Sequence, residues 1–183
     1  MKICIFCGAN RGNDPRIIEA VEELMNLLLA QGSTLIYGGG KTGLMGLIAD
    51  RFIAAGQPVI GVRPKKLIED EAAHLGIDEM MVVESMFERK AKMMELADVF
   101  IALPGGVGTL DEIIEVYTQV KIGFTDKLCT ILDVDGYYEG LDILLRQMIT
   151  KGFLKEADRP LLHFHQKPDT LAAQIASFSQ GYT

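Results

Sequence analysis

The sequence predicts a three-layer α/β fold with a mostly parallel central sheet of about six or seven strands. Short apolar runs of strand length alternate along the chain with longer segments whose apolar residues recur at helical spacing. Such alternation favours a parallel sheet that is covered by helices on both faces. The 183 residues show no internal repeat and no linker, so we expect residues 1–183 to form a single domain.

The first half of the chain supplies four of the expected strands. Asp14-Pro15 combines a helix-capping side chain with a proline suited to the first helical position, and apolar residues at helical spacing follow as far as Gln31-Gly32. The segment from residue 63 to residue 78 is mixed and charged, and its pattern favours no element. We expect strands at residues 1–6, 34–37, 58–62 and 79–83, and helices at residues 15–31, 44–55 and 85–97.

The second half continues the alternation. An apolar run predicts a strand at residues 99–103, and a helix then extends through Val120. The turn signal Asp135-Gly136 separates a strand near residues 128–132 from a helix at residues 137–151. A late segment near residues 161–165 and a last helix near residues 169–178 complete the expected elements.

The composition excludes several classes of protein. Apolar residues make up 49% and charged residues 23%, as in ordinary globular proteins. The net charge of −7 argues against a nucleic-acid partner, whose binding face would be basic. No apolar run approaches the ~20 residues of a membrane span, and the apolar start is too short for a signal peptide. The odd, small number of three cysteines favours a reducing compartment, so we expect a cytoplasmic protein.

The stretch from Leu103 to Glu112 is where we expect the function to reside. It reads as the end of a strand, a glycine-rich turn and the start of a helix. Glycines let the backbone approach a ligand, and a helix start offers unpaired N–H groups and the positive end of the helix dipole. These features favour an anion, and phosphate is the anion we expect. The alternative is a tight turn that binds nothing.

A second glycine stretch, residues 38–43 (GGGKTG), follows the second expected strand. It fits the G-x-G-x-x-G pattern of dinucleotide-binding folds, but no acidic residue follows about 20 residues on to hold a ribose. Leu35 stands where an ATP-type phosphate loop needs its first glycine. A structural turn and a supporting wall of the ligand cleft therefore remain open. In either case, the turns after Phe6, Tyr37 and Leu103 should share one edge of the sheet.

Two cations lie on the apolar side of the helix expected at residues 85–97. On a helical wheel, Arg89 and Lys90 fall within the apolar arc, whereas Glu88 falls on the opposite side. A charge on a core-facing arc is costly unless it is paired. The planar fork of Arg89 suits a carboxylate or a phosphate, so we expect it in the ligand site. For Lys90, a snorkelling side chain or an internal salt bridge is an equal alternative.

Glu112 has two interpretations. Residues 109–112 (TLDE) have the T-x-x-E pattern of a capping box, in which the glutamate accepts a hydrogen bond from a backbone N–H group. Glu112 also lies at the edge of the apolar helical face, one turn from the expected phosphate loop, where a carboxylate can reach a sugar. Both interpretations remain open from the residues alone.

The remaining reactive side chains show no catalytic or metal-binding pattern. Cys4 and Cys7 have C-x-x-C spacing, but on a strand they would point to opposite faces, which argues against a zinc or redox pair. His74, His163 and His165 lack the spacing of metal ligands, so we expect no metal site.

Three motifs taken together resemble the Lonely Guy (LOG) family of cytokinin riboside 5′-monophosphate phosphoribohydrolases. They are residues 37–46 (YGGGKTGLMG), residues 84–90 (ESMFERK) and residues 104–112 (PGGVGTLDE). The similarity runs from Cys7 to about Phe153 and includes residues 133–138 (DVDGYY). This resemblance implies a Rossmann-like fold, a homodimer, and an activity that uses no metal or redox cofactor.

The resemblance also implies roles for individual residues. Arg89 and Glu112 would be catalytic. The residues that bind the substrate would be Glu71, Lys90, Gly105, Gly106, Val107, Gly108, Thr109, Leu110, Asp111 and Thr118.

The predicted activity is hydrolysis of the N-glycosidic bond of a nucleoside 5′-monophosphate, AMP or a prenylated relative, to free base and ribose 5-phosphate. The expected partner is thus a small molecule. One alternative is a non-catalytic carrier of a nucleotide or of the molybdenum cofactor on the same fold. The other is a dinucleotide-dependent oxidoreductase, against which the missing ribose-binding acid argues.

Overall fold

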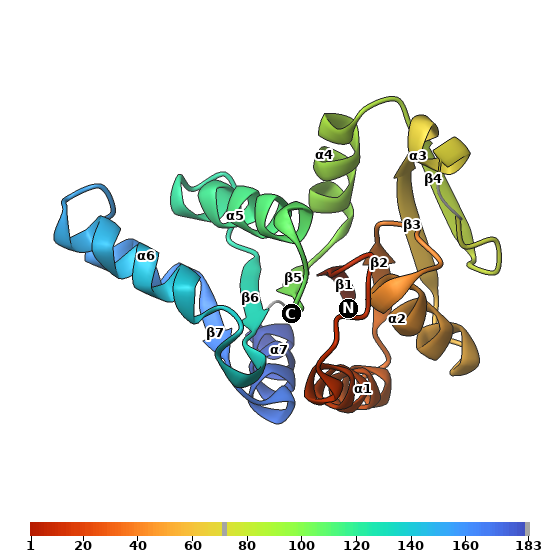
Figure 1. Ribbon diagram of the computed structural model, residues 1–183, viewed down its shortest axis with the longest axis horizontal. Coiled ribbons are helices and arrows are strands. Elements are labelled where there is room, and N and C mark those ends of the chain that lie inside the picture. The colour runs from red at the N-terminus through yellow and green to blue at the C-terminus, as the bar shows by residue number, and fades with distance from the viewer. Residues whose placement is uncertain (71–72, 182–183) are drawn as a thin grey trace.

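The computed structural model describes residues 1–70 and 73–181, and it has the predicted three-layer α/β fold (Figure 1). Seven strands form one sheet in the order β4-β3-β2-β1-β5-β6-β7, and every neighbouring pair is parallel. The strands are β1 (Lys2–Phe6), β2 (Thr34–Tyr37), β3 (Val59–Pro64), β4 (Glu79–Val83), β5 (Val99–Ala102), β6 (Leu128–Leu132) and β7 (His163–His165).

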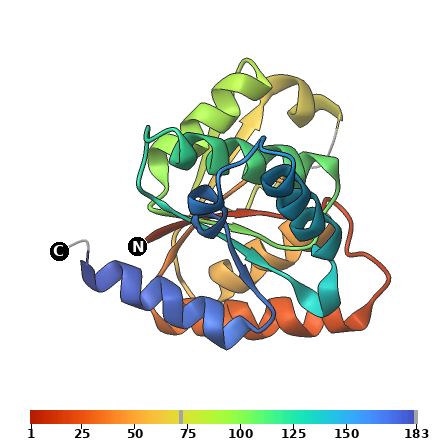
Figure 2. The same cartoon turned by 90° about the vertical axis from the view of Figure 1, so that its left-hand side faces the viewer.

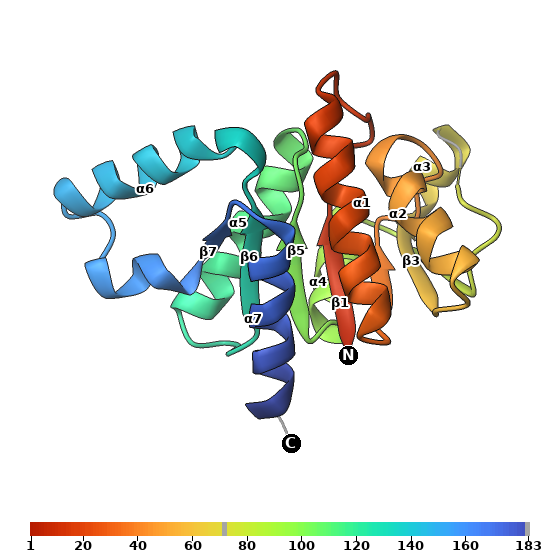
Figure 3. The ribbon, with the colours of Figure 1, turned by 90° about the horizontal axis from the view of Figure 1, so that it is seen from below.

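Helices cover both faces of the sheet. The α-helices are α1 (Pro15–Ala30), α2 (Gly43–Ala54), α3 (Lys65–Asp70), α4 (Met86–Leu96), α5 (Val107–Lys121), α6 (Glu139–Thr150) and α7 (Pro168–Gly181). Two 3-10 helices, η1 (Val134–Gly136) and η2 (Glu156–Leu161), flank α6 in the chain. Helices α1, α2 and α7 lie on one face, and α4 and α5 on the other (Figure 2). Figure 3 shows α1 and α7 side by side. None of the described helices is long and apolar enough to cross a membrane.

Alternate residues of each strand enter different halves of the core. Along β1, Ile3 and Ile5 pack against the face that carries α1, whereas Cys4 and Phe6 pack against the face that carries α5. This alternation follows from the two-residue period of a strand. It also places Cys7 on the α1 side, so that Cys4 and Cys7 face away from each other as predicted, and both are free thiols.

The segment that showed no pattern contains the end of β3 and the short helix α3. Arg63 extends the strand although it is charged, and it is only 1% exposed. Its guanidinium donates hydrogen bonds to the carbonyls of Gly38 and Leu67, which compensates for burial. A charged residue does not register as strand core in a hydropathy pattern, so the sequence alone missed this continuation.

The three glycine turns meet at the carboxyl edge of the sheet, as predicted. Phe6 and Ala102 are paired at the ends of β1 and β5, so the chain leaves both strands side by side. The Gly8 N–H donates to the carbonyl of Pro104 at 3.3 Å, and the Leu44 N–H donates to the carbonyl of Gly8 at 3.1 Å. The loops after β1, β2 and β5 therefore form one continuous surface, where ligands bind in open parallel sheets.

Candidate active site

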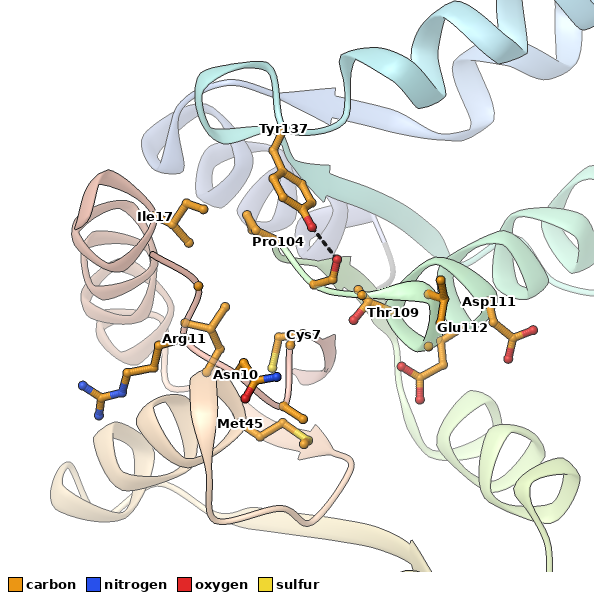
Figure 4. A pocket seen from close by; sticks show the side chains of 18 of the residues that line it. Cys7, Asn10, Arg11, Ile17, Met45, Pro104, Thr109, Asp111, Glu112 and Tyr137 are labelled. Carbon is orange, nitrogen blue, oxygen red and sulfur yellow. Dashed lines mark hydrogen bonds between the residues drawn. The ribbon is translucent and has the colours of Figure 1, made fainter. Parts of the chain in front are cut away.

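A cavity of about 490 Å³ opens between these loops (Figure 4). The first loop contributes one wall, the glycine stretch after β5 the opposite one, and Tyr137 of the η1–α6 turn part of the rim. In Figure 4, the Glu112 carboxylate points toward the cavity, whereas the side chains of Arg11 and Asp111 point away from it. The residues that line the cavity include Cys7, Ala9, Asn10, Arg11, Ile17, Leu44, Met45, Met86, Arg89, Gly105, Gly106, Val107, Gly108, Thr109, Asp111, Glu112 and Tyr137.

The floor of this cavity includes the start of α5. The helix begins at Val107 with Gly106 as its N-cap, so the N–H groups of the first turn have no partner within the helix. Together with the positive end of the helix dipole, they favour a bound anion. Gly105 must lack a side chain here, because a Cβ atom would lie 2.2 Å from Oγ1 of Thr109 and 2.9 Å from the backbone nitrogen of Gly8.

The capping-box interpretation of Glu112 is wrong. Because α5 begins at Val107, Thr109 lies inside the helix and is not its N-cap. Glu112 instead forms an ion pair with Arg89 of α4, with Oε1 and Nη2 3.0 Å apart. Its carboxylate is thus positioned by a neighbouring helix.

The Arg89–Glu112 pair is buried at the base of the cavity. The side chains are 11% and 8% exposed, respectively. The Nε–H group of Arg89 also donates to the carbonyl of Val62 at 3.2 Å, which fixes the guanidinium against the end of β3. Oε1 of Glu112 accepts no aligned hydrogen bond within the described residues, so a ligand hydroxyl or a water molecule in the cavity can use it.

Two opposing effects set the pKa of Glu112. Burial raises it above the ordinary value of a glutamate, because desolvation disfavours the charged form. The positive charge of Arg89 lowers it and so counteracts part of that effect. Burial has the larger influence, and the net direction is upward.

The second glycine stretch supports the cleft, although residues 38–43 do not themselves line the cavity. A Cβ atom on Gly38 would lie 2.3 Å from Nη2 of Arg89, so only glycine leaves room for the guanidinium. Gly43 has a φ of +64°, and a Cβ atom there would lie 2.2 Å from the carbonyl group of Ala9. Leu44 and Met45 then line the cavity directly. The stretch brings the first loop and Arg89 into place.

Lys90 does not line the cavity, and its side chain contacts α5. Its Nζ atom lies 3.0 Å from Oδ2 of Asp111 and 2.6 Å from Oε2 of Glu115. These contacts are internal salt bridges, one of the alternatives that the sequence offered for Lys90. Together with the Arg89–Glu112 pair, they join α4 to α5 beside the cavity.

Three further predicted residues lie elsewhere or are not described. The hydroxyl of Thr118 donates to the carbonyl of Ile114 at 2.8 Å, on an exposed part of α5 that does not line the cavity. Leu110 borders a smaller adjoining hollow with Tyr138. Glu71 lies outside the described residues.

Sequence reasoning assigned no role to several residues that line the cavity outside the glycine loop and the Arg89–Glu112 pair. Asn10, Ile17 and Met86 line it, as does Tyr137, whose hydroxyl donates to the carbonyl of Gly105 at 2.5 Å (Figure 4). Met86 and Tyr137 lie within the quoted motifs at residues 84–90 and 133–138, but those motifs gave neither of them a role. The position of Asn10 in the loop that follows the first strand could also have suggested a role.

The described histidines are bound to protein groups. Nε2 of His74 lies 3.0 Å from Asp50, and Gln174 lies between His163 and His165. Within the described part of the chain, no group of three His, Cys, Asp or Glu side chains could hold a metal ion.

The fold and the cavity define a class: a Rossmann-like α/β protein with a cleft suited to a small phosphorylated ligand. Comparison with known proteins gives the family. The family model described as "Possible lysine decarboxylase" matches residues 45–175. Two Arabidopsis thaliana proteins named as cytokinin riboside 5′-monophosphate phosphoribohydrolases are 40% and 38% identical over 97% of this chain, covering 83% and 82% of their own lengths. The chain therefore belongs to the LOG family, as its motifs predict.

Solved structures with less sequence similarity share the fold. A molybdenum cofactor carrier protein from Chlamydomonas reinhardtii superposes with a TM-score of 0.72 at 17% identity, over 98% of both chains. A molybdenum cofactor binding protein from Rippkaea orientalis gives a TM-score of 0.70 at 21% identity, over 96% of this chain and 95% of that one. At this level of identity, the likeness shows the fold alone.

Proposed function

We propose that this protein hydrolyses the N-glycosidic bond of a nucleoside 5′-monophosphate and releases free base and ribose 5-phosphate. The observation that carries the proposal is the buried Arg89–Glu112 ion pair at the base of a cavity whose floor is the start of α5. Its family relatives named as cytokinin riboside 5′-monophosphate phosphoribohydrolases support the same reaction. The candidate substrates are AMP and its prenylated relatives.

The arrangement suits each part of such a substrate. The N–H groups from Gly106 to Thr109 would hold the 5′-phosphate. Glu112 lies one helical turn further along α5, so a ribose that extends from the phosphate would reach its carboxylate. Cleavage of a glycosidic bond passes through a transition state with oxocarbenium character, whose positive charge a carboxylate stabilises. Glu112 can also orient a water molecule and accept its proton.

Arg89 would have two roles in this reaction. Its charge opposes the effect of burial on the pKa of Glu112, and so helps the carboxylate to stay ionised. Its guanidinium lines the cavity and presents further N–H donors to the ribose-phosphate or to the leaving base.

The assignment of the binding residues remains a prediction. The cavity geometry supports Gly105, Gly106, Val107, Gly108 and Thr109 as the phosphate loop. Roles for Lys90, Leu110, Asp111, Thr118 and Glu71 rest on the resemblance. For Lys90 and Asp111, which bind each other, the geometry supports an indirect role that holds α4 against α5.

The family model's decarboxylase description does not fit the cavity. Decarboxylases that use pyridoxal phosphate bind it through a lysine Schiff base. Arg11 and Arg89 are the cations among the described residues that line the cavity, and Lys90, which does not line it, is paired with Asp111 and Glu115. Among the described residues, the cavity therefore offers no lysine that could form such a Schiff base.

The test is a panel of substrates with chromatographic detection of free base. AMP, prenylated AMP and other nucleoside 5′-monophosphates are incubated with the protein beside the corresponding nucleosides. We expect base release from at least one monophosphate and far slower release from its nucleoside, because the nucleoside lacks the group that the helix start binds. Nucleotide binding without base release from any monophosphate would instead indicate a carrier.

We also propose that the chain forms a homodimer, as the resemblance implies. Large apolar side chains are exposed on α4 and around the end of α5, including Phe87 at 81%, Phe124 at 78% and Ile122 at 54%. Exposed side chains of this size and apolar character are candidates for burial between two copies of the chain. Light scattering after gel filtration should give twice the mass of one chain. For Phe87→Ser, the measured mass should fall toward that of a single chain.

A cytoplasmic location is the remaining proposal. Cys4, Cys7 and Cys129 are all free and buried thiols, as expected for a protein of a reducing compartment. Fractionation of cells followed by detection of the chain would test this location.

A further inference from the structure

Four consecutive carbonyl groups that precede α5 all accept hydrogen bonds from the protein. The donors and distances are Tyr138 Oη to Leu103 O at 2.7 Å, Gly8 N to Pro104 O at 3.3 Å, Tyr137 Oη to Gly105 O at 2.5 Å, and Leu110 N to Gly106 O at 3.2 Å. Two of the four donors are neighbouring tyrosine hydroxyls. The negative ends of these peptide dipoles are thus bound by donors of the protein.

This arrangement matters for an anion. In a trans peptide, the C=O group of one residue and the N–H group of the next point in opposite directions. The peptide between Gly105 and Gly106 is flanked by two glycines, which restrict its rotation less than other residues do. If that peptide rotated by half a turn, a carbonyl oxygen would take the place of an N–H group and would repel a bound phosphate.

We propose that Tyr137 is a positioning residue for the phosphate-binding loop. Its hydroxyl holds the Gly105 carbonyl and so fixes the direction of the Gly106 N–H group (Figure 4). The phosphate itself is part of the proposed function above, on which this inference rests. Tyr137 acts on the ligand through the loop, so it should affect binding of the phosphate more than the chemical step.

The turn that carries Tyr137 is built to hold it there. Asp135 and Gly136 both have positive φ angles, of 52° and 74°, which reverse the chain sharply before the tyrosines. Asp135 forms an ion pair with Arg16 of α1, with the charged atoms 2.7 Å apart. The rings of Tyr137 and Tyr138 pack edge to face, with centroids 5.0 Å apart, and Tyr138 is buried. The turn is therefore connected to α1 through Asp135 and to the end of β5 through the Tyr138 hydroxyl, which binds the Leu103 carbonyl.

The two tyrosines differ in how exposed they are. Tyr138 is 6% exposed and its hydroxyl is enclosed, so removal of that hydroxyl would disturb the core as well as the loop. Tyr137 is 49% exposed, and only its hydroxyl contacts the loop carbonyl. Tyr137→Phe thus removes one hydrogen bond and leaves the ring in place.

The experiment compares Tyr137→Phe with Tyr117→Phe. Tyr117 makes the same kind of bond, from its hydroxyl to the carbonyl of Asp158 at 3.1 Å, outside the cavity. Binding of ribose 5-phosphate is measured by calorimetry, the melting temperature is recorded, and kcat and KM are measured with AMP. A hydrogen bond of ordinary net strength corresponds to a change of roughly 3- to 10-fold in affinity.

We expect Tyr137→Phe to raise the Kd for ribose 5-phosphate and the KM for AMP by roughly that factor, with kcat within about twofold of wild type. Tyr117→Phe should leave the Kd unchanged. Equal Kd values for wild type and Tyr137→Phe would overturn the inference. An equal loss of affinity in Tyr137→Phe and Tyr117→Phe would also overturn it, as would a wild type that does not bind ribose 5-phosphate. Failure of the proposed reaction is distinguishable, because the wild type would then bind ribose 5-phosphate without releasing base from any monophosphate.

Discussion

Arg89 of α4 and Glu112 of α5 meet at 3.0 Å beneath the cavity, and both are almost fully buried. An ion pair so placed has to be held by its surroundings, since desolvation of two charges is expensive. Here the Val62 carbonyl binds the guanidinium, and the absence of a side chain at Gly38 leaves space for it. The buried position of the pair and its access to the cavity set the expectations that follow.

The first expectation concerns the pH dependence of turnover. Glu112 must be ionised to stabilise positive charge or accept a proton, and burial raises its pKa above the ordinary 4.5. At saturating AMP, kcat should therefore fall on acidification with an apparent pKa above 4.5. This apparent pKa is measured from steady-state rates between pH 4 and pH 8, corrected for spontaneous loss of base from AMP. An acid limb at or below 4.5 would show that another group limits the reaction.

The same shift has a consequence for stability. Between pH 4.5 and the raised pKa of Glu112, the folded state binds more protons than the unfolded state. The free energy of unfolding of the wild type should thus fall as pH rises through that window. In Glu112→Gln, residue 112 does not titrate, so it makes no such contribution to the pH dependence. The free energy of unfolding of Glu112→Gln minus that of the wild type should therefore be larger at pH 7 than at pH 4. Urea titrations at both pH values test this. The opposite trend would mean that attraction to Arg89 outweighs burial.

Gly108→Ala separates ligand binding from folding. Beyond its own turn of the helix, a Cβ atom at position 108 would meet no atom of the described residues within 4 Å, and the residue lies in the first turn of α5 on the cavity wall. Alanine favours a helix over glycine by up to about 1 kcal/mol, so the melting temperature should stay level or rise. The added methyl group would occupy space that we assign to phosphate, so the KM for AMP should rise by at least about tenfold, equivalent to roughly 1.4 kcal/mol. An unchanged KM would place the phosphate elsewhere.

Gly38→Ala tests the support of Arg89. The new Cβ atom would lie 2.3 Å from Nη2 of Arg89, which is the end of a flexible side chain and can move. We expect a folded protein in which the guanidinium is displaced and turnover drops by on the order of 10²-fold or more. Gly140→Ala on α6 is the matched control, because a Cβ atom there meets nothing within 4 Å. Wild-type activity in Gly38→Ala would argue that the position of Arg89 is not critical.

Periodicity and turn signals were sufficient to predict most of the fold and the place of Arg89 beside the cavity. Arg89 could be predicted because its place on the apolar arc of a helix is a local property of the sequence. The start of α5 could not, because Val107 and Gly108 are weak helix formers and the T-x-x-E pattern two residues later is a stronger local signal. The helix begins earlier in the fold, and this shift removes the capping role of Glu112.

The contribution of Asn10 and Tyr137 to the cavity could not be predicted from the sequence for a different reason. Asn10 and Tyr137 approach the glycine loop from the ends of β1 and β6, which the strand order places on either side of β5. Strand order is a non-local property that no pattern within one segment encodes. A buried cation such as Arg63 is likewise explained only by the carbonyls it meets in the folded chain.

Release of base from AMP or prenylated AMP by wild type, Glu112→Gln and Glu115→Gln tests the central claim most directly. Glu115 lies on the same helix, but its carboxylate binds Lys90 outside the cavity, so it controls for loss of a charge from α5. We predict that Glu112→Gln still binds ribose 5-phosphate but releases base slower by on the order of 10²- to 10⁴-fold, whereas Glu115→Gln stays near the wild-type rate. A fully active Glu112→Gln protein would contradict the account, and the catalytic carboxylate would have to be sought elsewhere.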